Sequence, residues 1–529
     1  MSRNRIPIID LFAGPGGLGE GFSRYRGKGG SSRFETVLSI EKDRWAYRTL
    51  ELRSFFRQFA DGHAPDEYYM YLEGLIAREE LFDAFPEESA RAKNEAWCAE
   101  LGSKKFPPEV VRERIYSALK GAKIWALLGG PPCQAYSLVG RSRMLGEDRK
   151  KKDEENRVRY EDDHRHFLYK HYLRIIADHR PPVFVMENVK GLLSATLRGS
   201  STITRIFKDL RAPRLAVYGE QSSTLAYQLF PLNASGLAPL EIDPKPQEFL
   251  VEAEHFGIPQ CRHRLFLVGV RADMAKLGIP SPLKNGQEPI PAFHAISDLP
   301  QIRSKLSKND TFQLWQDWII SACDSKWIWE SNVPQEVRDE IFRALQHTPT
   351  SNVGGPFVPR RNPKLPKFAP EWFHDPKLQG WVNHEARGHM APDLHRYLFA
   401  AAFAKAKGRS PKLKDFPQGL LPDHQNVDKN DLKNTIFADR FRVQLATHPS
   451  TTITSHAAKD GHYYIHPDPR QCRSLTVREA ARLQTFPDNY FFEGGRTEQF
   501  KQVGNAVPPL LAVQIAAVIS DLFIRTATL

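Results

Sequence analysis

A cysteine preceded by two prolines is the first residue whose setting suggests chemistry. Cys133 stands in Gly129-Gly-Pro-Pro-Cys-Gln-Ala-Tyr-Ser137, directly after the apolar run Ile124–Leu128. Because consecutive prolines stiffen the backbone and lack N–H donors, this thiol is presented from a turn and not from a helix. A lone cysteine at the end of a strand is a candidate nucleophile if its surroundings help the thiol to lose its proton. The alternative is an inert buried cysteine, which we expect of the other four: Cys98, Cys261, Cys323 and Cys472.

A glutamate and two arginines also stand at strand ends. Glu187, in Met186-Glu-Asn-Val189, closes the apolar run that begins at Val183. A carboxyl group there can hold or donate a proton if burial raises its pKa, although a solvated glutamate is the simpler interpretation. Arg262 and Arg264 lie in Gln260-Cys-Arg-His-Arg264, at the start of another strand. Alternation puts both on one side, where they could orient a carboxylate or phosphate, or form only a solvated strand end.

A glycine-rich turn near the start of the chain predicts a ligand loop. In Asp10-Leu-Phe-Ala-Gly-Pro-Gly-Gly-Leu-Gly19, the glycines would let the backbone approach a ligand at the start of a helix. Glu41, which follows the apolar run Thr36–Ile40, is placed to bind a ribose hydroxyl. The order Phe-x-Gly-x-Gly is not the dinucleotide fingerprint, which argues against NAD, and a purely structural turn explains it equally well.

A second turn lies close to the other end of the chain. Gln502-Val-Gly-Asn-Ala-Val-Pro-Pro509 precedes an apolar helix whose first turn suits the two prolines. Gly504 and Asn505 would then face whatever lies above that helix, although capping alone would explain them.

The elements that must position these residues form an α/β pattern. Four apolar runs predict buried strands, and two stretches between them predict helices. In open parallel sheets, ligands bind at the carboxyl ends of the strands, where the polar residues above stand. A further pair of strands is expected to be hydrogen-bonded to each other. The strands are 6–12, 36–40, 124–128, 183–186, 249–252 and 265–270, and the helices are 18–25 and 44–56.

The length and the changes of pattern along the chain predict several domains. A chain of 529 residues is too long for one core. We expect a catalytic domain over 1–275, with an inserted helical subdomain at about 60–120 and a mobile charged loop at 140–166. Residues 276–440 form a smaller irregular domain rich in basic and aromatic side chains, and 441–529 return to the catalytic domain.

Composition limits the class of protein. The hydrophobic share of 41% and the charged share of 26% exclude general disorder, and the net charge of +12 favours an anionic partner such as nucleic acid. Five cysteines without a CxxC pair predict neither a disulfide framework nor a zinc site, which fits a reducing cytoplasmic compartment. The apolar stretch Ala506–Ser520 is shorter than the about 20 residues that a membrane span needs, and no signal peptide is expected.

The order of these motifs resembles the DNA (cytosine-5)-methyltransferase family. The glycine loop, Pro-Pro-Cys-Gln, Glu-Asn-Val, Gln-x-Arg-x-Arg and Gly-Asn-Ala-Val-Pro follow one another as they do in that family. Arg478-Glu-Ala-Ala-Arg-Leu-Gln-Thr-Phe-Pro487 also resembles the family block before the last motif. The matching stretches are Pro7–Asp43, Ile124–Leu193, Glu248–Arg271 and Val443–Val518.

The resemblance implies a Rossmann-like fold that uses S-adenosylmethionine, with a target-recognition domain at 276–440. It implies four catalytic residues: Cys133, Glu187, Arg262 and Arg264. It assigns cofactor binding to Phe12, Gly14, Gly16, Gly17, Leu18, Glu41, Pro131, Asn505 and Val507. It assigns DNA contacts to Gln134, Ser137, Arg141 and Gln260, and no residue to a metal. The family's adenine-contacting acid has no clear match, and Asp61 and Glu100 are the candidates.

The implied reaction is methylation of cytosine carbon 5 in a specific duplex DNA site. Cys133 would add to carbon 6 of a flipped cytosine while Glu187 binds ring nitrogen 3. The expected setting is a restriction-modification or phage-defence system, with the enzyme acting as a monomer on DNA beside restriction or defence proteins. Two alternatives stay open, a transfer-RNA cytosine-5 methyltransferase and a catalytically silent DNA-binding scaffold.

Overall fold

The computed structural model describes residues 5–27, 30–60, 63–131, 168–197, 200–233, 244–347, 351–361, 364–422 and 438–527. Four predicted residues, Cys133, Gln134, Ser137 and Arg141, lie outside these ranges, and so do Asp61 and the predicted loop 140–166.

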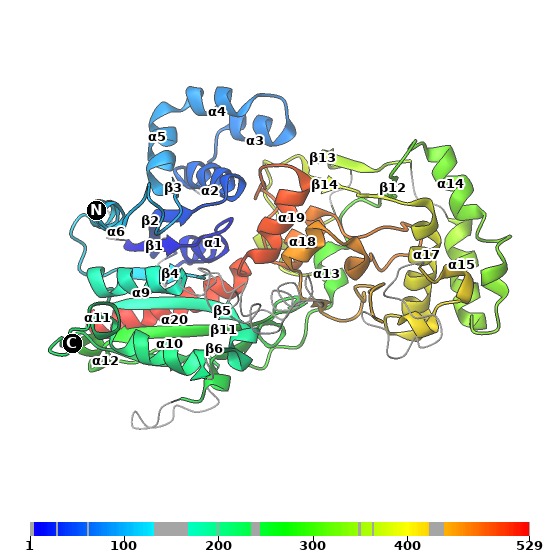
Figure 1. Cartoon of the computed structure of the whole chain (residues 1–529). Coiled ribbons are helices and arrows are strands. Elements are labelled where there is room, and N and C mark those ends of the chain that lie inside the picture. Colours follow the sequence, from blue (N-terminus) through cyan, green and yellow to red (C-terminus); the bar gives the residue numbers. More distant parts are fainter. Residues whose placement is uncertain are drawn as a thin grey trace.

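One mixed sheet forms the centre of the catalytic part (Figure 1). Its strand order is β3-β2-β1-β4-β5-β11-β8, and β9 pairs with β11. The strands from β3 to β5 are parallel, whereas β11 runs antiparallel to β5, β8 and β9. Their bounds are β1 Ile6–Leu11, β2 Phe34–Glu41, β3 Ala96–Cys98, β4 Ala126–Gly129, β5 Val183–Val189, β8 Tyr227–Pro231, β9 Leu250–Glu252 and β11 His263–Arg271.

The connections after β1 and β4 leave the sheet side by side. β1 pairs with β2 on one side and with β4 on the other, so the strand order reverses at β1. A parallel sheet opens a ligand crevice at such a switch point. The glycine turn that follows β1 and Gly129–Pro131 at the end of β4 both lie at this crevice edge. The topology therefore brings two of the predicted motifs together.

Helices cover both faces of the sheet, and the strand residues alternate between them. Ile8 and Leu128 pack with α1, α12 and α20 on one face. Ile9 and Leu127 pack with α6, α9 and α10 on the other face. The helices are α1 Gly17–Arg24, α6 Pro108–Leu119, α9 Leu168–His179, α10 Thr202–Arg211, α12 Ala272–Ala275 and α20 Pro509–Ala527. Two separate apolar layers thus hold the sheet that carries the site.

Helix α20 is long and strongly apolar. The segment Arg496–Thr526, which contains it, is long and apolar enough to span a membrane, but 67% of its most apolar window is buried inside the protein. Leu511, Ile515 and Ile519 of α20 are at most 1% exposed and pack against the sheet. Core packing therefore accounts for its composition.

The stretch expected to be an inserted helical subdomain is more closely tied to the sheet than predicted. Its strand β3 pairs with β2, and its helix α6 packs on the sheet, so residues 96–119 complete the central layer. The remaining helices, α3 Asp66–Glu73, α4 Arg78–Ala84 and α5 Pro86–Glu95, pack beside α2 (Arg44–Arg57). We call α3, α4 and α5 the extra helices. A three-residue strand leaves too little pattern in the sequence to be recognised.

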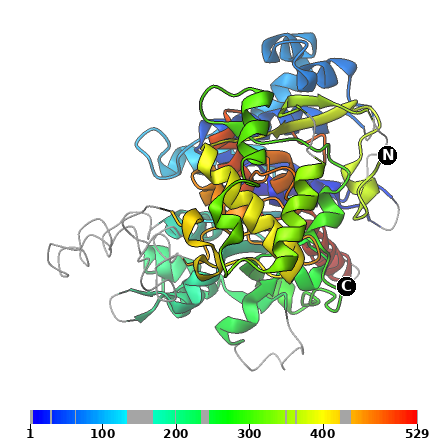
Figure 2. The same ribbon diagram turned by 90° about the vertical axis from the view of Figure 1, so that its right-hand side faces the viewer.

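Residues 276–440 pair no strand with the central sheet among those that the structure describes. Helices α14 and α15 pack against α17 around an apolar cluster, which Figure 2 shows from its outer side. This stretch was expected to be irregular, and these helices were missed, although α15 carries buried apolar residues at helical spacing, Val337, Ile341 and Ala344. Their bounds are α14 Phe312–Ile320, α15 Gln335–Gln346 and α17 Ala391–Lys407, and the shorter elements are α13 Ala292–Ile296, α16 Pro370–Phe373 and the ribbon of β13 Gly354–Pro359 with β14 Gly380–Glu385.

The C-terminal segment divides between the two parts. Phe441, Val443 and Ile465 join the cluster of α14, α15 and α17, and residues of α18 (Val477–Leu483) and α19 (Arg496–Asn505) pack with α13 and Trp381. Val507 and α20 belong to the apolar layer on one face of the central sheet. The segment from 441 onward therefore contacts both parts of the chain.

Candidate active site

The turn after β1 has a backbone that favours glycine. Gly14 and Gly16 have positive φ angles of 58° and 95°, and Phe12 before them has a φ of 55°. A non-glycine residue in this region costs free energy, which is tolerated mainly where the site needs the geometry. A Cβ at Gly14 would meet no atom within 4 Å, so the space above this turn is open to a ligand.

The C-terminal segment packs directly on this turn. A Cβ at Gly17 would lie 2.2 Å from the carbonyl oxygen of Val507. The hydroxyl of Tyr490 donates a hydrogen bond to the carbonyl oxygen of Pro15 in the same turn. Asn505, the last residue of α19, is exposed beside these contacts. The two ends of the chain therefore lie in contact at the glycine turn.

The carboxylate of Glu41 is held by three backbone donors. Gly14 N donates to one oxygen at 2.8 Å, and the N–H groups of Lys42 and Asp43 donate to the other at 2.8 Å each. The acid is thereby fixed at the edge of the glycine turn, half-buried and ready to accept a further hydrogen bond from a ligand hydroxyl.

Glu100 comes two residues after β3, whose last residue, Cys98, lies opposite Glu41 in the sheet. The amide of Ala99 donates to the carbonyl oxygen of Glu41 at 3.0 Å, and the carboxylate of Glu100 forms an exposed ion pair with Lys42. Of the two residues considered for the adenine-contacting acid, Glu100 is thus the one that the described structure brings to the crevice. Recognition of the short strand 96–98 would have placed Glu100 here, but that strand was not predicted from the sequence.

Asp10 is a buried acid that the sequence analysis left without a role. It is 1% exposed, and its carboxyl group lies against the backbone of Gly19. Burial raises the pKa of Asp10 to about 7. Its oxygen Oδ2 lies 3.2 Å from where a Cβ of Gly19 would be, so the acid sits under the first turn of α1.

Glu187 and Arg264 form an ion pair beside the end of β4. The Arg264 Nε lies 3.0 Å from Glu187 Oε1, and both side chains are less than one-fifth exposed. A Cβ at Gly130 would lie 3.0 Å from Glu187 Oε2, so this carboxylate rests on the backbone of Gly130. Burial lowers the pKa of Arg264, and Glu187 counteracts that shift. The pair thus holds a carboxylate of fixed orientation against Gly130, which precedes Cys133 by three positions in the sequence.

Asn188 is a positioning residue that the sequence analysis did not single out. Its Nδ2 donates to the carbonyl oxygen of Pro131 at 3.4 Å, and its Oδ1 accepts from the amide of Val189 at 2.8 Å. Pro131 is buried at this contact. Asn188 therefore ties the end of β5 to the turn that leads to Cys133.

Arg262 and Gln260 hold the two parts of the chain together. Arg262 is 1% exposed and donates to the carbonyl oxygens of Ile453 at 2.9 Å and Gly504 at 3.2 Å. Gln260 is fully buried, and its amide bonds to the Leu483 carbonyl at 3.1 Å. Gln260 was expected to contact DNA, and this burial corrects that expectation, because its polar atoms are satisfied inside the protein.

Two predicted cofactor residues have their side chains in the core. Leu18 and Val507 are each 6% exposed and belong to the apolar layer between α1, α20 and the sheet. Any contact of these two residues with a ligand at the glycine turn therefore involves their backbone. Leu18 N–H belongs to the first turn of α1, where donors are unpaired in a helix.

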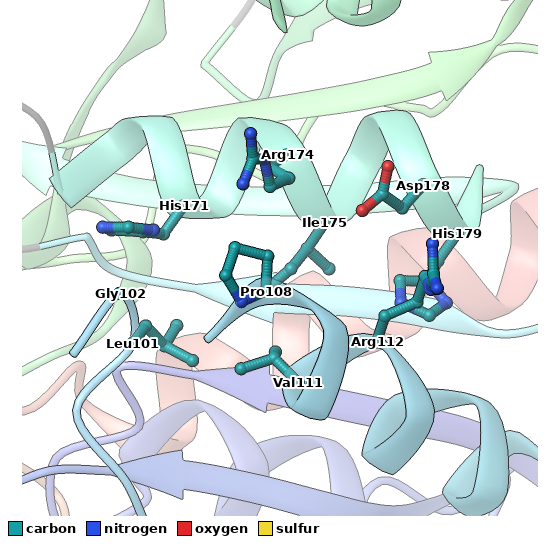
Figure 3. A pocket seen from close by; sticks show the side chains of 10 residues that line it. All are labelled: Leu101, Gly102, Pro108, Val111, Arg112, His171, Arg174, Ile175, Asp178 and His179. Carbon is teal, nitrogen blue, oxygen red and sulfur yellow. The ribbon is translucent and has the colours of Figure 1, made fainter. Parts of the chain in front are cut away.

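The crevice in Figure 3 is a packing seam and not part of this site. It runs between α6 and α9, and its lining includes Leu101, Pro108 and Ile175. A Cβ at Gly102 would lie 2.1 Å from the ring of His171, so the loop after β3 packs directly on α9. Among the described residues, no predicted site residue lines this seam.

Four histidines within residues 276–440, namely His374, His384, His389 and His395, each contact other residues of the protein. His384 Nε2 donates to the Pro300 carbonyl oxygen at 3.1 Å, its Nδ1 accepts from Thr476 Oγ1 at 2.9 Å, and burial lowers its pKa to about 4. His389 stacks edge-on against Tyr397, and burial lowers its pKa as well. His374 bonds to Arg360, and His395 to the Trp318 carbonyl.

A family model and several individual relatives place this chain in the same family. Residues 90–213 and 245–521 match the model of the C-5 cytosine-specific DNA methylases. The type II methyltransferase M.Bpa9945I of Bacillus paralicheniformis is 30% identical, over 97% of this chain and 98% of its own length. M.AgeI of Thalassovita gelatinovora is 25% identical, over 97% of this chain and 99% of its own length. The DNA (cytosine-5-)-methyltransferase M.ApeKI of Aeropyrum pernix is 24% identical, over 98% of this chain and 99% of its own length.

A solved structure supports the same fold. A putative DNA modification methyltransferase encoded within an E. coli prophage superimposes with a TM-score of 0.50. It is 19% identical, and the match covers 98% of this chain and 99% of that one. The sheet order described above is therefore that of a Rossmann-like methyltransferase fold.

Proposed function

Because the chain belongs to the C-5 cytosine-specific DNA methylase family, we propose that it transfers a methyl group from S-adenosylmethionine to carbon 5 of a flipped cytosine in a specific duplex DNA site. The observation that carries this proposal is the Glu187–Arg264 ion pair packed against Gly130, at the crevice end of the sheet. It supplies an oriented carboxylate beside Gly130, which precedes the candidate nucleophile Cys133 by three positions in the sequence.

The residues at the switch point fit the cofactor. The open space above Gly14 would allow a ligand to approach the backbone closely. The fixed carboxylate of Glu41 would accept a hydrogen bond from the ribose, and the exposed amide of Asn505 would add a polar contact. Phe12, Gly16 and the backbone of Gly17, Leu18 and Val507 would complete the pocket with Pro131, and Glu100 would meet the adenine end. When bound, the cofactor supplies an electrophilic methyl group.

Cys133 has to activate the cytosine ring. Carbon 5 of an aromatic cytosine is a weak nucleophile, so the thiolate of Cys133 adds to carbon 6 and makes carbon 5 enamine-like. After methylation, loss of the carbon 5 proton re-forms the double bond and expels the thiolate. The addition divides one difficult step into easier ones.

Glu187 stabilises the charge that this addition creates. Its carboxyl group binds or protonates ring nitrogen 3 as electron density moves there. Arg264 holds one carboxylate oxygen and leaves the other directed at the turn of Gly130. Arg262 acts through the C-terminal segment, whose Ile453 and Gly504 it binds.

DNA would lie between the two parts of the chain. Extruding the cytosine costs a few kcal/mol, which contacts with the strand must offset. Gln134, Ser137 and Arg141 would contribute such contacts near Cys133, and residues 276–440 would form the target-recognition domain. The chain's net charge of +12 supports binding to a polyanion.

The relatives support a role in a restriction-modification system. Those named above include type II methyltransferases, and the match to M.Bpa9945I and M.AgeI extends over nearly the whole of each protein. We therefore propose that this enzyme, acting as a monomer, protects host DNA from a partner nuclease with the same target site.

Incubation with methyl-labelled S-adenosylmethionine tests this function. We expect label to enter duplex DNA and to co-elute with 5-methylcytosine after digestion. Label in transfer RNA but not in duplex DNA would replace the DNA substrate with RNA, and no transfer to either would leave a silent scaffold. Bisulfite sequencing of DNA from cells that express the protein then gives the recognised site.

A further inference from the structure

Asp375 is a buried carboxylate where three separate parts of the chain meet. It lies in the loop between α16 and β14, within residues 276–440, and is 7% exposed. The hydroxyl of Tyr69 donates to its Oδ2 at 2.8 Å, and Asn489 Nδ2 donates to the same oxygen at 2.6 Å. The amide of Lys377 donates to Oδ1 at 3.0 Å. Such charge-assisted bonds are stronger than neutral ones and geometrically specific.

Tyr69 belongs to the extra helices, which contribute no strand to the central sheet. It lies on α3, whose Tyr68 and Leu72 pack in one apolar cluster with Leu378 and Val382 of the other part. Lys377 Nζ also donates to the carbonyl oxygen of Ala64, just before α3, at 2.8 Å. Figure 1 shows α3 beside the ribbon of β13 and β14. The extra helices thus contact both the catalytic sheet and the proposed recognition region.

A continuous set of buried polar contacts leads from Asp375 to the first turn of α1. Asn489, which binds Asp375, accepts a bond from Arg53 Nη1 at 3.0 Å. Arg53 in turn forms a buried pair with Glu20 at 2.9 and 2.5 Å. Glu20 follows the glycine turn directly. Asn489 is therefore fixed from the catalytic side, and Tyr69 provides a second attachment of the same carboxylate.

We propose that Tyr69 and Asp375 are positioning residues for DNA recognition, and that the extra helices form a brace that sets the orientation of residues 276–440 toward the catalytic sheet. This inference rests on the proposed function, because it needs that region to read DNA. The brace would keep the aligned arrangement populated before DNA binds. If only a fraction of the molecules is aligned, the apparent affinity for DNA is reduced in proportion to that fraction.

Tyr69→Phe tests the brace with a close control on the same helix. Tyr71 also lies on α3, but its hydroxyl donates to Glu493 Oε1 at 2.7 Å, in the C-terminal segment and not in the proposed recognition region. Both variants, in the full-length protein, lose one phenolic hydrogen bond. For Tyr69→Phe we expect the KM for a duplex carrying the site found by bisulfite sequencing to rise about tenfold, since 1.4 kcal/mol corresponds to a factor of ten. We expect kcat and the Kd of S-adenosylhomocysteine to stay the same.

Site discrimination gives the second measurement. Bisulfite sequencing of host DNA should show more methylation at sites one base pair from the target for Tyr69→Phe than for Tyr71→Phe. A double-mutant cycle with Asp375→Asn should show that the two changes are not additive in DNA binding. Equal losses of thermal stability in both tyrosine variants, with unchanged KM and discrimination, would overturn the brace. Failure of the wild-type protein to methylate DNA would instead overturn the proposed function, so the two failures are distinct.

Discussion

The guanidinium of Arg264 holds the carboxylate of Glu187 at 3.0 Å, and this carboxylate rests on Gly130 at the turn before Cys133. The two residues come from adjacent antiparallel strands, where Arg264 lies opposite Val189 and Glu187 opposite Phe266. Strand register thus fixes the direction of the acid before any substrate binds, which reduces the reorganisation needed during the reaction.

Replacement of this acid should slow methyl transfer and leave DNA binding nearly intact. Glu187→Gln keeps the shape but cannot supply a proton to ring nitrogen 3 or stabilise its charge. We expect single-turnover rates to fall by about 10²-fold or more, with DNA Kd changed less than threefold, because acid–base groups typically contribute factors of that size. Glu220→Gln, which breaks a pair with Arg214 far from the crevice, is the matched control. If DNA affinity fell as much as the rate, Glu187 would be a binding residue.

Arg262 should matter chiefly for stability. Its guanidinium is buried and donates to the carbonyl oxygens of Ile453 and Gly504, so Arg262→Met leaves both acceptors without this donor. We expect the free energy of unfolding, measured in urea, to fall by about 2–4 kcal/mol. Arg264→Met should reduce turnover more than Arg262→Met does, and it should reduce the free energy of unfolding less. The reverse ranking of the two variants would contradict these roles.

The close approach of Gly17 to Val507 predicts a cofactor-binding defect. A methyl group at Gly17 would meet the Val507 carbonyl oxygen at 2.2 Å, and backbone atoms cannot simply rotate away. Gly17→Ala should therefore displace the segment around Asn505, lower stability by about 1–3 kcal/mol and weaken S-adenosylhomocysteine binding in calorimetry. Gly27→Ala, where a Cβ would meet no atom within 4 Å, is the control. Equal affinity in both variants would argue against a cofactor pocket closed by the C-terminal segment.

Asp10 predicts a specific dependence of stability on pH. Burial raises its pKa from 3.8 to about 7, so the unfolded chain loses this proton at lower pH than the folded protein does. The contribution of Asp10 to stability is therefore complete below about pH 4 and is lost as the pH rises to about 7. The total loss is on the order of 4 kcal/mol.

Asp10→Asn removes this titration. In urea unfolding at pH 5, 6, 7 and 8, we expect the variant to gain stability relative to the wild type as the pH rises, and the difference to level off above pH 7. A difference that stays constant over this range would show that Asp10 titrates normally.

Much of the catalytic part could be predicted from sequence because its signals are local. The glycine turn, Glu41 and Glu187 each follow an apolar run directly, and a parallel sheet brings such positions together by topology alone. The paired strands that begin at Leu250 and His263 were recognised for the same reason.

The parts that sequence reasoning missed depend on distant contacts. Gln260 lies 223 positions from the carbonyl of Leu483 that satisfies it, so nothing near it in the sequence showed that it is buried. The strand β3 is only three residues long, and its pairing with β2 is what reveals Glu100 at the crevice. The contact of Tyr69 with Asp375 spans 306 positions and joins two segments that share no motif.

The transient bond between Cys133 and carbon 6 of the target cytosine is measured most directly by a mechanism-based trap. A duplex with 5-fluorocytosine at the target position carries fluorine where the proton must leave, so the adduct cannot resolve after methyl transfer. With S-adenosylmethionine, we expect a complex that resists denaturation, and peptide mapping that places the crosslink on Cys133, with none in Cys133→Ser. An enzyme that methylates the normal duplex but forms no crosslink at Cys133 on the fluorinated one would contradict the covalent mechanism.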